Sequence, residues 1–179
     1  MTMNSEDRKE RIRILRRKDD RKTRLPNMLI ELSKITKSQF SENEVLTIEQ
    51  IDIHKIHVQY SNFNSCYLNI HFPIEKASEL SKTLNTLSDE LSKKNYLILS
   101  DFSDIAVLNV NTNFIVDKFE EIIQLDKNSL TLYNHIYQNG LCIDLFEEYC
   151  YFDNETKKSF VYELRIFGKD WIKLIAEKL

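Results

Sequence analysis

The sequence predicts an α+β domain in which a largely antiparallel central sheet is flanked by helices and preceded by a basic N-terminal helix. Runs of alternating hydrophobic residues recur along the chain, and most neighbouring runs are joined by short polar turns of the kind that connect antiparallel strands. Segments with hydrophobic residues at steps of three and four lie between them. The length of 179 residues suits one hydrophobic core. We therefore expect a helical extension over residues 1–24 and a single α+β domain over residues 25–179.

The N-terminal extension is strongly basic. Residues 1–24 contain ten lysines and arginines against five acidic residues, a net charge of +5, and the rest of the chain carries −8. Ser5 is a suitable N-cap for a helix over about residues 6–21. We expect Leu25-Pro26 to interrupt this helix, because the residue before a proline is disfavoured in the helical conformation. A second helix is expected over residues 27–37.

A β-hairpin is predicted between residues 51 and 72. Alternate residues from His54 to Tyr60, and again from Cys66 to Phe72, fit two half-buried strands. The intervening residues 61–65 are rich in Asn and Ser, which bond their own backbone in turns.

The clearest helical pattern follows the hairpin. Hydrophobic residues recur there at alternating steps of three and four from Ala77 to Leu91, which predicts an amphipathic helix over residues 74–94. A further helix is expected over residues 114–125, with Asn111, Thr112 or Asn113 as its cap. The remaining predicted elements are strands 96–99, 105–110, 130–136, 141–152 and 159–167 and a closing helix over residues 169–179.

Several classes of protein fit the composition poorly. The three cysteines are scattered and form no C-x-x-C pair, so we expect reduced thiols rather than disulfides or a zinc ribbon. The two glycines are too few for a phosphate-binding loop. No apolar run approaches the roughly 20 residues that span a bilayer, and the N-terminus lacks the apolar core of a signal peptide. We therefore expect a cytoplasmic protein that does not contact membranes.

Candidate residues for metal binding or catalysis are isolated. His57 and His71 could meet across the predicted hairpin, but no cysteine or carboxylate at ligand spacing completes a metal site. His54 and His57 would point to opposite faces of a strand. No nucleophile motif such as G-x-S-x-G is present, and paired carboxylates are more common as solvated surface. We expect no catalytic residues, no metal, no cofactor and no small-molecule substrate, and hence a protein that is not an enzyme.

The basic extension raises the possibility of nucleic-acid binding. Arg13, Arg17, Arg21 and Arg24 fall on one face of the predicted helix, where they would displace counterions from phosphates. The same segment also holds five carboxylates and has no aromatic residue for stacking on bases. The other interpretation is a solvated helix that pairs with the acidic body or with a partner.

The acidic body contains a better candidate for a contact surface. Tyrosines lie beside carboxylates between residues 144 and 155, and aromatic anchors within a charged rim are typical of protein interfaces. An acidic surface would attract a basic partner protein. The predicted partner-binding residues are Asp101, Asp104, Asp144, Glu147, Glu148, Tyr149, Tyr151, Asp153 and Glu155.

Two stretches of the C-terminal third carry a resemblance to a known class of proteins. The run from Asn139 to Asp144 (NGLCID) and the run from Tyr162 to Trp171 (YELRIFGKDW), together with the arginine-rich head, resemble small bacterial immunity proteins encoded beside polymorphic toxins, including those of contact-dependent growth inhibition. The resemblance covers about half of the chain. It implies a cytosolic, non-enzymatic protein that binds its cognate toxin domain and covers or distorts the active site.

Many toxins of such systems are basic nucleases, for which an acidic surface imitates nucleic acid. These families diverge quickly, so the resemblance assigns no toxin-binding residue by position. The leading expectation is an immunity protein whose acidic and aromatic segment faces the toxin. The alternative is a nucleic-acid-binding or regulatory protein that uses the basic N-terminal helix.

Overall fold

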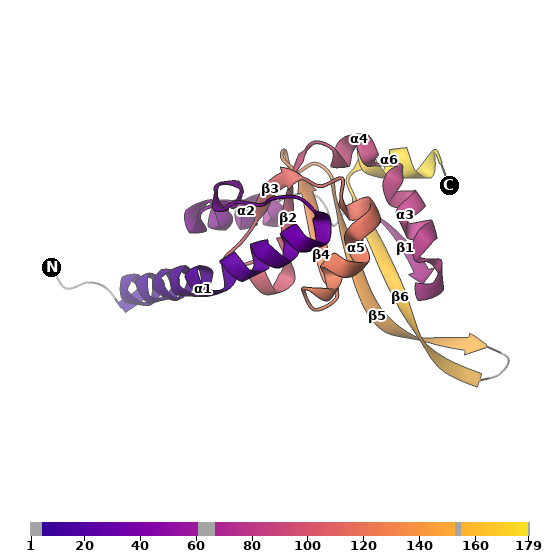
Figure 1. Ribbon diagram of the computed structural model, residues 1–179, viewed down its shortest axis with the longest axis horizontal. Helices are drawn as coiled ribbons and strands as arrows, with labels where there is room; N and C mark the ends of the chain where they lie inside the picture. Colours follow the sequence, from indigo (N-terminus) through magenta and orange to yellow (C-terminus); the bar gives the residue numbers. More distant parts are fainter. Residues whose placement is uncertain (1–4, 61–66, 153–154, 179) are drawn as a thin grey trace.

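The protein, described by a computed structural model over residues 5–60, 67–152 and 155–178, has the predicted α+β fold (Figure 1). Six strands form one antiparallel sheet in the order β1-β6-β5-β4-β2-β3. The strands are β1 (Tyr67–Pro73), β2 (Lys94–Leu99), β3 (Leu108–Asn111), β4 (Ser129–Asn134), β5 (Gly140–Phe152) and β6 (Glu155–Phe167). The helices are α1 (Ser5–Thr36), α2 (Ile48–Tyr60), α3 (Ala77–Asn85), α4 (Ser88–Leu91), α5 (Ile115–Gln124) and α6 (Lys169–Ala176), with short 3-10 turns η1 (Glu42–Glu44), η3 (Ile74–Lys76) and η4 (Ser100–Phe102).

The main hydrophobic core lies between one face of the sheet and the helices α1, α3, α5 and α6 (Figure 1). The strand register aligns hydrophobic side chains across neighbouring strands: Leu97 pairs with Leu132, Leu132 with Leu141 and Leu141 with Ile166. All four are fully buried. Burial of each such side chain contributes about 1.5–3 kcal/mol, so this row and its neighbours stabilise both the sheet and the helices that cover it.

The helix α2 covers part of the opposite face, where the hairpin prediction for residues 51–72 is wrong in its first half. Residues 48–60 form a helix because Ile48, Ile51 and His54, at steps of three, are buried against the sheet. Thr47 and Gln50 cap this helix reciprocally: the Thr47 hydroxyl accepts the Gln50 N–H (3.2 Å), and the Gln50 side-chain oxygen accepts the Thr47 N–H (2.8 Å). The second predicted strand is β1, which pairs with β6. The predicted turn at 61–65 lies outside the described residues.

The predicted interruption of the first helix at Leu25-Pro26 is also wrong, because α1 continues through Pro26. A proline inside a helix removes one hydrogen bond and costs about 3 kcal/mol. Contacts on both sides of the proline offset this cost: Leu25, Met28 and Leu32 are buried in the core, and arginines on the N-terminal side bind the body, as described below.

Helices and strands after residue 73 are located correctly, with differences at their ends. The helix predicted over 74–94 is divided into η3, α3 and α4, and its last residue, Lys94, begins β2. Of the predicted inward residues, Leu80, Leu84, Leu87 and Leu91 are buried and Ala77 is half-buried. The helix predicted over 114–125 corresponds to α5, and the three predicted C-terminal strands correspond to β4, β5 and β6.

None of the three proposed cap residues caps α5 with its side chain. The N-cap position is held by Phe114, which makes no side-chain cap bond. The Thr112 hydroxyl instead donates to the Leu91 carbonyl (3.1 Å), and the Asn111 side-chain oxygen accepts the Asn113 N–H (3.0 Å). The side-chain hydrogen bonds of Asn111 and Thr112 therefore stabilise the turn before α5, and they do not cap the N–H groups of its first turn.

Both glycines lie at one corner, where the β4–β5 turn meets the junction of β6 and α6. Gly168 has φ +87, and a Cβ atom there would lie 2.1 Å from the Gln138 carbonyl oxygen. A Cβ atom on Gly140 would lie 2.5 Å from the Leu132 carbonyl oxygen. In both cases the close atom is backbone and cannot rotate away, so the corner requires residues without side chains.

We expect Gly168→Ala to destabilise the protein by about 3 kcal/mol or more, because it adds the penalty of a positive φ to a backbone clash. Urea unfolding followed by circular dichroism measures this loss. Lys169→Ala, at the adjacent exposed position, is the matched control and should change stability by less than about 0.5 kcal/mol. Equal stabilities for the two variants would contradict the assigned geometry.

Candidate partner-binding site

Strands β5 and β6 extend beyond the rest of the sheet as a two-stranded ribbon (Figure 1). The strand β4 pairs with β5 only as far as Asp144, and β1 pairs with β6 only from Val161 onward. Pairing between β5 and β6 continues to Phe152 and Glu155. Residues 147–152 of β5 and 155–160 of β6 lie beyond both neighbouring strands, and six residues at about 3.3 Å each give the ribbon a length of about 20 Å. This projection coincides with the predicted contact segment.

The ribbon and its base are acidic. Residues 144–163 contain six acidic residues and two lysines. Glu147 is exposed and pairs with Lys158 across the ribbon at 3.0 Å. Glu148 is half-buried, and its carboxylate lies 3.6 Å from Nδ1 of His71. The acidic residues of this segment therefore outnumber its lysines by four.

The remaining predicted contact residues of this segment lie at the ribbon tip. Tyr149 and Tyr151 belong to β5 and pair through the backbone with Lys158 and Thr156. Glu155 begins β6. The side chains of residues 149–157 lie outside the described part of the structure, as does all of Asp153. Their placement on the ribbon follows from the backbone alone.

A polar cluster occupies the face of the sheet opposite the main core, at the base of the ribbon. The register places His71, Glu163 and Asp144 side by side on β1, β6 and β5. Burial disfavours the ionised form of Glu163, but hydrogen bonds from Asn69 and Arg165 outweigh this effect and hold the pKa of its carboxyl below the usual value. His71 Nε2 lies 3.7 Å from Glu163.

Sequence reasoning did not include His71, Glu163 or Arg165 among the contact residues. The alternation of charged and hydrophobic residues along β6 is the signal that could have found two of them, since it places Glu163 and Arg165 on the polar face of the sheet. The partnership with His71 depends on the long-range pairing of β1 with β6, which no local pattern reveals.

Cys142 lies next to this cluster and is a free thiol. The thiol donates a hydrogen bond to Asp144 (3.3 Å) and accepts one from the Thr131 hydroxyl (3.4 Å). Burial and the neighbouring Asp144 carboxylate raise the pKa of the Cys142 thiol to about 12. The neutral thiol therefore fills space and bonds its neighbours rather than acting as a nucleophile.

Asp101 and Asp104 lie apart from the ribbon, on the connection between β2 and β3. In the sheet, β2 is separated from β5 by β4. Asp101 forms an ion pair with Lys127, and Asp104 forms one with Lys55 that lowers the pKa of the Asp104 carboxyl. Both predicted contact residues are thus engaged within the chain, at a distance of two strands from the ribbon.

The arginine row of α1 also binds within the chain. Arg17 is buried, with its Nε donating to the Asp104 carbonyl (2.8 Å) and its Nη1 donating to both oxygens of the Asp52 carboxylate (2.7 and 2.9 Å). One turn earlier, Arg13 bonds Glu10 and lies 3.6 Å from Asp52. These contacts fasten α1 to α2 and to the β2–β3 connection.

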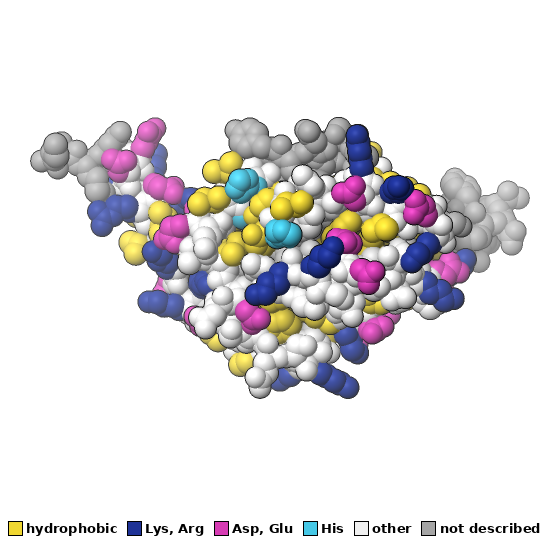
Figure 2. Space-filling model, turned by 90° about the horizontal axis from the view of Figure 1, so that it is seen from above, with side chains coloured by type: hydrophobic (Ala, Val, Ile, Leu, Met, Phe, Trp, Pro, Cys, Tyr) yellow, Lys and Arg dark blue, Asp and Glu magenta, His cyan; other side chains and the backbone are white. Residues whose placement is uncertain are grey.

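The later members of the row continue the attachment. Arg21 Nη1 donates to the carbonyls of Leu46 (2.5 Å) and Ile105 (3.2 Å). Arg24 donates to the Asp101 carbonyl (3.1 Å), and its guanidinium lies 4.7 Å from the centre of the Phe102 ring. Figure 2 shows Lys and Arg side chains interspersed with Asp and Glu at the α1 end rather than gathered into a continuous basic patch. The face that suggested nucleic-acid binding is therefore largely occupied by the protein itself.

Two of the histidines that were predicted on strands, His54 and His57, lie on α2, whereas His71 lies on β1 as predicted. His54 is buried, and its Nδ1 lies 2.9 Å from the Tyr137 hydroxyl. The Tyr137 ring stacks between those of His57 (4.9 Å between centroids) and Tyr96 (5.2 Å). Within the described residues no group of three or more His, Cys, Asp and Glu side chains is arranged to hold a metal ion.

Comparisons with family models, with curated proteins and with solved structures each found no match to this chain. Within the described ranges, none of the helices is both long enough and apolar enough to cross a bilayer.

We expect Arg17→Ala to destabilise the protein by about 2–3 kcal/mol, because it leaves the half-buried Asp52 carboxylate and the Asp104 carbonyl without their partner. Residues 5–20 should also exchange amide hydrogens faster. Urea unfolding and hydrogen-exchange mass spectrometry measure the two effects. The neighbouring exposed Arg16→Ala is the control, with an expected change below about 0.5 kcal/mol. An Arg17→Ala variant with wild-type stability and wild-type hydrogen exchange would contradict the anchoring role of Arg17.

We expect stability to fall by about 2 kcal/mol between pH 7 and pH 5 through His54 alone. Burial lowers the pKa of His54 from 6.5 to about 4, so the folded state keeps it neutral while the unfolded chain takes up a proton. The stability that depends on a neutral His54 is fully present above pH 6.5 and is lost as the pH falls toward 4. Urea unfolding at several pH values measures it.

The pH series is compared with His54→Phe, in which this part of the pH dependence should disappear, and with His57→Phe, in which most of it should remain because burial, and to a smaller extent His57, lowers the pKa of His54. Identical pH profiles in the wild type and His54→Phe would show that His54 does not titrate as described.

Proposed function

We propose that this protein acts by binding another protein, and that it is an immunity protein that neutralises a cognate toxin domain by covering its active site. The observation that supports this most directly is the β5–β6 ribbon, which projects about 20 Å beyond its neighbouring strands and whose sequence is rich in carboxylates. The resemblance of the C-terminal third to immunity proteins agrees with this proposal. The location of such a protein would be the cytoplasm, where the toxin acts.

Electrostatics favour a basic partner. The exposed carboxylate of Glu147 and the half-buried carboxylates of Asp144 and Glu148 give the ribbon base a negative field, and a complementary field accelerates the encounter of two proteins. A nuclease whose active site holds phosphates has such a basic surface. The acidic ribbon would then occupy the path of the nucleic acid.

The shape of the ribbon suits an active-site cleft. A two-stranded ribbon is about 5 Å wide between its strand axes and can enter a groove that a whole sheet cannot. The polar cluster of His71, Glu163 and Arg165 at the ribbon base would then form the rim of the contact, where charged pairs tune specificity more than affinity.

The alternative function, nucleic-acid binding through the N-terminal helix, draws less support from the geometry. Arg17, Arg21 and Arg24 donate their hydrogen bonds to the body of the protein, so they are not available to phosphates without losing those bonds. A salt-sensitive affinity for DNA or RNA that is abolished by deletion of residues 1–24 would favour this alternative over the immunity function.

Co-expression with the product of the adjacent gene tests the proposal. We expect the two proteins to purify as a complex and the chain to protect cells from the toxin. The double variant Glu147→Lys, Glu148→Lys should slow association by about 10–100-fold, because it reverses two charges of the ribbon. Stopped-flow or surface plasmon resonance measures the association rate.

The control is Asp89→Lys, Glu90→Lys on α4, which precedes β2 at the end of the sheet opposite to the ribbon. This variant should associate at the wild-type rate and protect cells. A chain that purifies alone and gives no protection rules the immunity function out, and equal rates for both double variants would remove the ribbon from the interface.

A further inference from the structure

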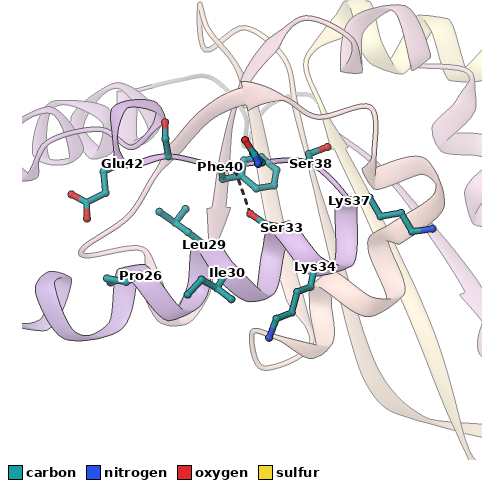
Figure 3. Close-up of a pocket in the computed structure, with 11 residues that line it drawn as sticks. Pro26, Leu29, Ile30, Ser33, Lys34, Lys37, Ser38, Phe40 and Glu42 are labelled. Atoms are coloured by element: carbon teal, nitrogen blue, oxygen red, sulfur yellow. Dashed lines mark hydrogen bonds between the residues drawn. The ribbon is translucent and has the colours of Figure 1, made fainter.

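The two edge strands of the sheet differ in what lies beside them. The edge at β3 is covered, because Val45 forms a β-bridge with Leu108. Figure 3 shows the segment over residues 38–42 that leads to this bridge, where the Phe40 N–H donates to the Ser33 hydroxyl of α1 (3.3 Å). An edge that is short and covered in this way is protected from pairing with a further strand.

The strand β1 forms the other edge, and the strand register identifies its outward backbone groups. The Leu145 N–H donates to the Asn128 carbonyl (2.8 Å), so the odd-numbered residues of β5 direct their backbone groups toward β4. The alternation continues through the pairs of β5 with β6 and of β6 with β1, which leaves the N–H and C=O groups of Tyr67, Asn69 and His71 at the edge. Within the described ranges, no residue bonds to these groups.

The core side of β1 is incomplete at this edge. Leu68 and Ile70 are only half-buried, whereas Ile166 and Leu164, their partners on β6, are fully buried. The difference arises because β6 has a strand on each side and β1 has a strand on one side only. A further strand with apolar side chains in this position would complete the cover of the core.

The β1 edge also lacks the charges that commonly keep exposed strands from pairing. The strand contains no Asp, Glu, Lys or Arg. The ribbon strands, by contrast, carry charged side chains such as those of Glu147 and Lys158. A strand that pairs with β1 therefore meets no opposite charge along it, which favours an uncharged strand over a basic or an acidic one.

A second copy of β1 fits this edge in one register. When the two strands run antiparallel with Asn69 opposite the Asn69 of the second copy, Tyr67 lies opposite His71 on one face, and Leu68 lies opposite Ile70 on the core side. Three outward N–H groups from each copy meet three carbonyls of the other, which gives six backbone hydrogen bonds. Aromatic pairs and aliphatic pairs directly opposite each other stabilise neighbouring strands.

We infer that two copies of this chain associate through β1 into a two-fold symmetric dimer with one continuous sheet of twelve strands, six from each copy. Six backbone hydrogen bonds are fewer than the roughly ten of a typical stable interface, so we expect a dissociation constant of about 10–100 µM. The two-fold axis reverses the strand direction, and the two β5–β6 ribbons therefore project from opposite ends. Both ribbons remain accessible, and the dimer does not rest on the proposed function.

Sedimentation velocity of the full chain tests the dimer. We expect a monomer at about 1 µM and mostly dimer at about 500 µM, because association depends on protein concentration. The variant Asn69→Lys sets two like charges against each other on the two-fold axis and should weaken the dimer by about ten-fold or more. The matched control is Asn113→Lys, at an exposed asparagine that follows the opposite edge strand β3, and it should dimerise as the wild type does.

A charge exchange at the same position tests the register. Asn69→Asp should also weaken self-association, whereas an equimolar mixture of Asn69→Asp and Asn69→Lys places unlike charges opposite each other. We expect the mixture to associate about ten-fold more tightly than either variant alone. Asn69 also donates to Glu163 within its own chain, so circular dichroism is used to confirm that both variants fold. A folding defect would not be repaired by mixing the two variants.

Amide hydrogen exchange measured by NMR locates the interface. At about 500 µM the amides of Tyr67, Asn69 and His71 should exchange about four-fold or more slowly than at low concentration, because the second copy then accepts their hydrogen bonds. The amides of Leu68 and Ile70 already face β6 and should not change. In Asn69→Lys the exchange of all of these amides should be independent of concentration.

Three results would overturn the dimer. The first is a folded wild type that stays monomeric at about 500 µM. The second is a dimer that Asn69→Lys leaves intact, or a mixture of the two charge variants that associates no better than either alone. The third is a different occupant of the edge: a chain that is monomeric by itself and whose β1 amides become protected only in a complex with the product of the adjacent gene. Loss of toxin protection in the ribbon variants, by contrast, bears only on the proposed function.

Discussion

The thirteen-pair register between β5 and β6 is the constraint on which the rest of the fold depends. At one end of the pairing, Leu141 lies opposite Ile166 and both are buried in the core. At the other end, the two strands continue beyond their neighbours and form the ribbon. A slip of either strand by one residue would turn the hydrophobic side chains of that strand to the polar face, because side chains alternate along a strand. Gly140 and Gly168 fix the inner end of the pairing by allowing backbones to approach where a side chain would collide. The same hydrogen-bonded pair thus sets the core, the polar face and the projecting ribbon.

The separation of charge between the N-terminal segment and the rest of the chain has a structural use. The arginines of α1 donate to the carboxylates of Glu10 and Asp52 and to four backbone carbonyls, those of Leu46, Asp101, Asp104 and Ile105. Backbone acceptors in connecting segments need partners from elsewhere, and a guanidinium offers several donors in a fixed fork. The partners of these arginines lie on α1, on α2 and the residues before it, and on the β2–β3 connection, so their charge does not offset that of the ribbon. The surface therefore keeps its negative charge at the ribbon.

Much of the fold could be predicted from local patterns, and the exceptions have physical causes. The β6 strand and the α5 helix were found because their periodicities are clear and their neighbours agree with them. The α2 helix was mistaken for a strand because His54, Ile56 and Val58 also alternate, although the Thr47-x-x-Gln50 capping box was available in the sequence. The continuity of α1 through Pro26 could not be predicted, since it depends on tertiary contacts.

At the candidate site, the acidic ribbon coincides with the predicted segment. Its contacts with His71 depend on the partner of β1, which only the fold supplies.

The pairing of β1 with β6 makes assembly of this domain a late event during its synthesis. Residues 67–73 find their sheet partner in residues 161–167, so the hydrophobic side of β1, with Leu68, Ile70 and Phe72, has no neighbouring strand until residues 161–167 have left the ribosome. Contacts that are so far apart along the chain slow folding and prolong the exposure of apolar surface. A nascent chain that stalls before β6 would present an open sheet edge, and its fate would depend on chaperones more than on the stability of the finished fold.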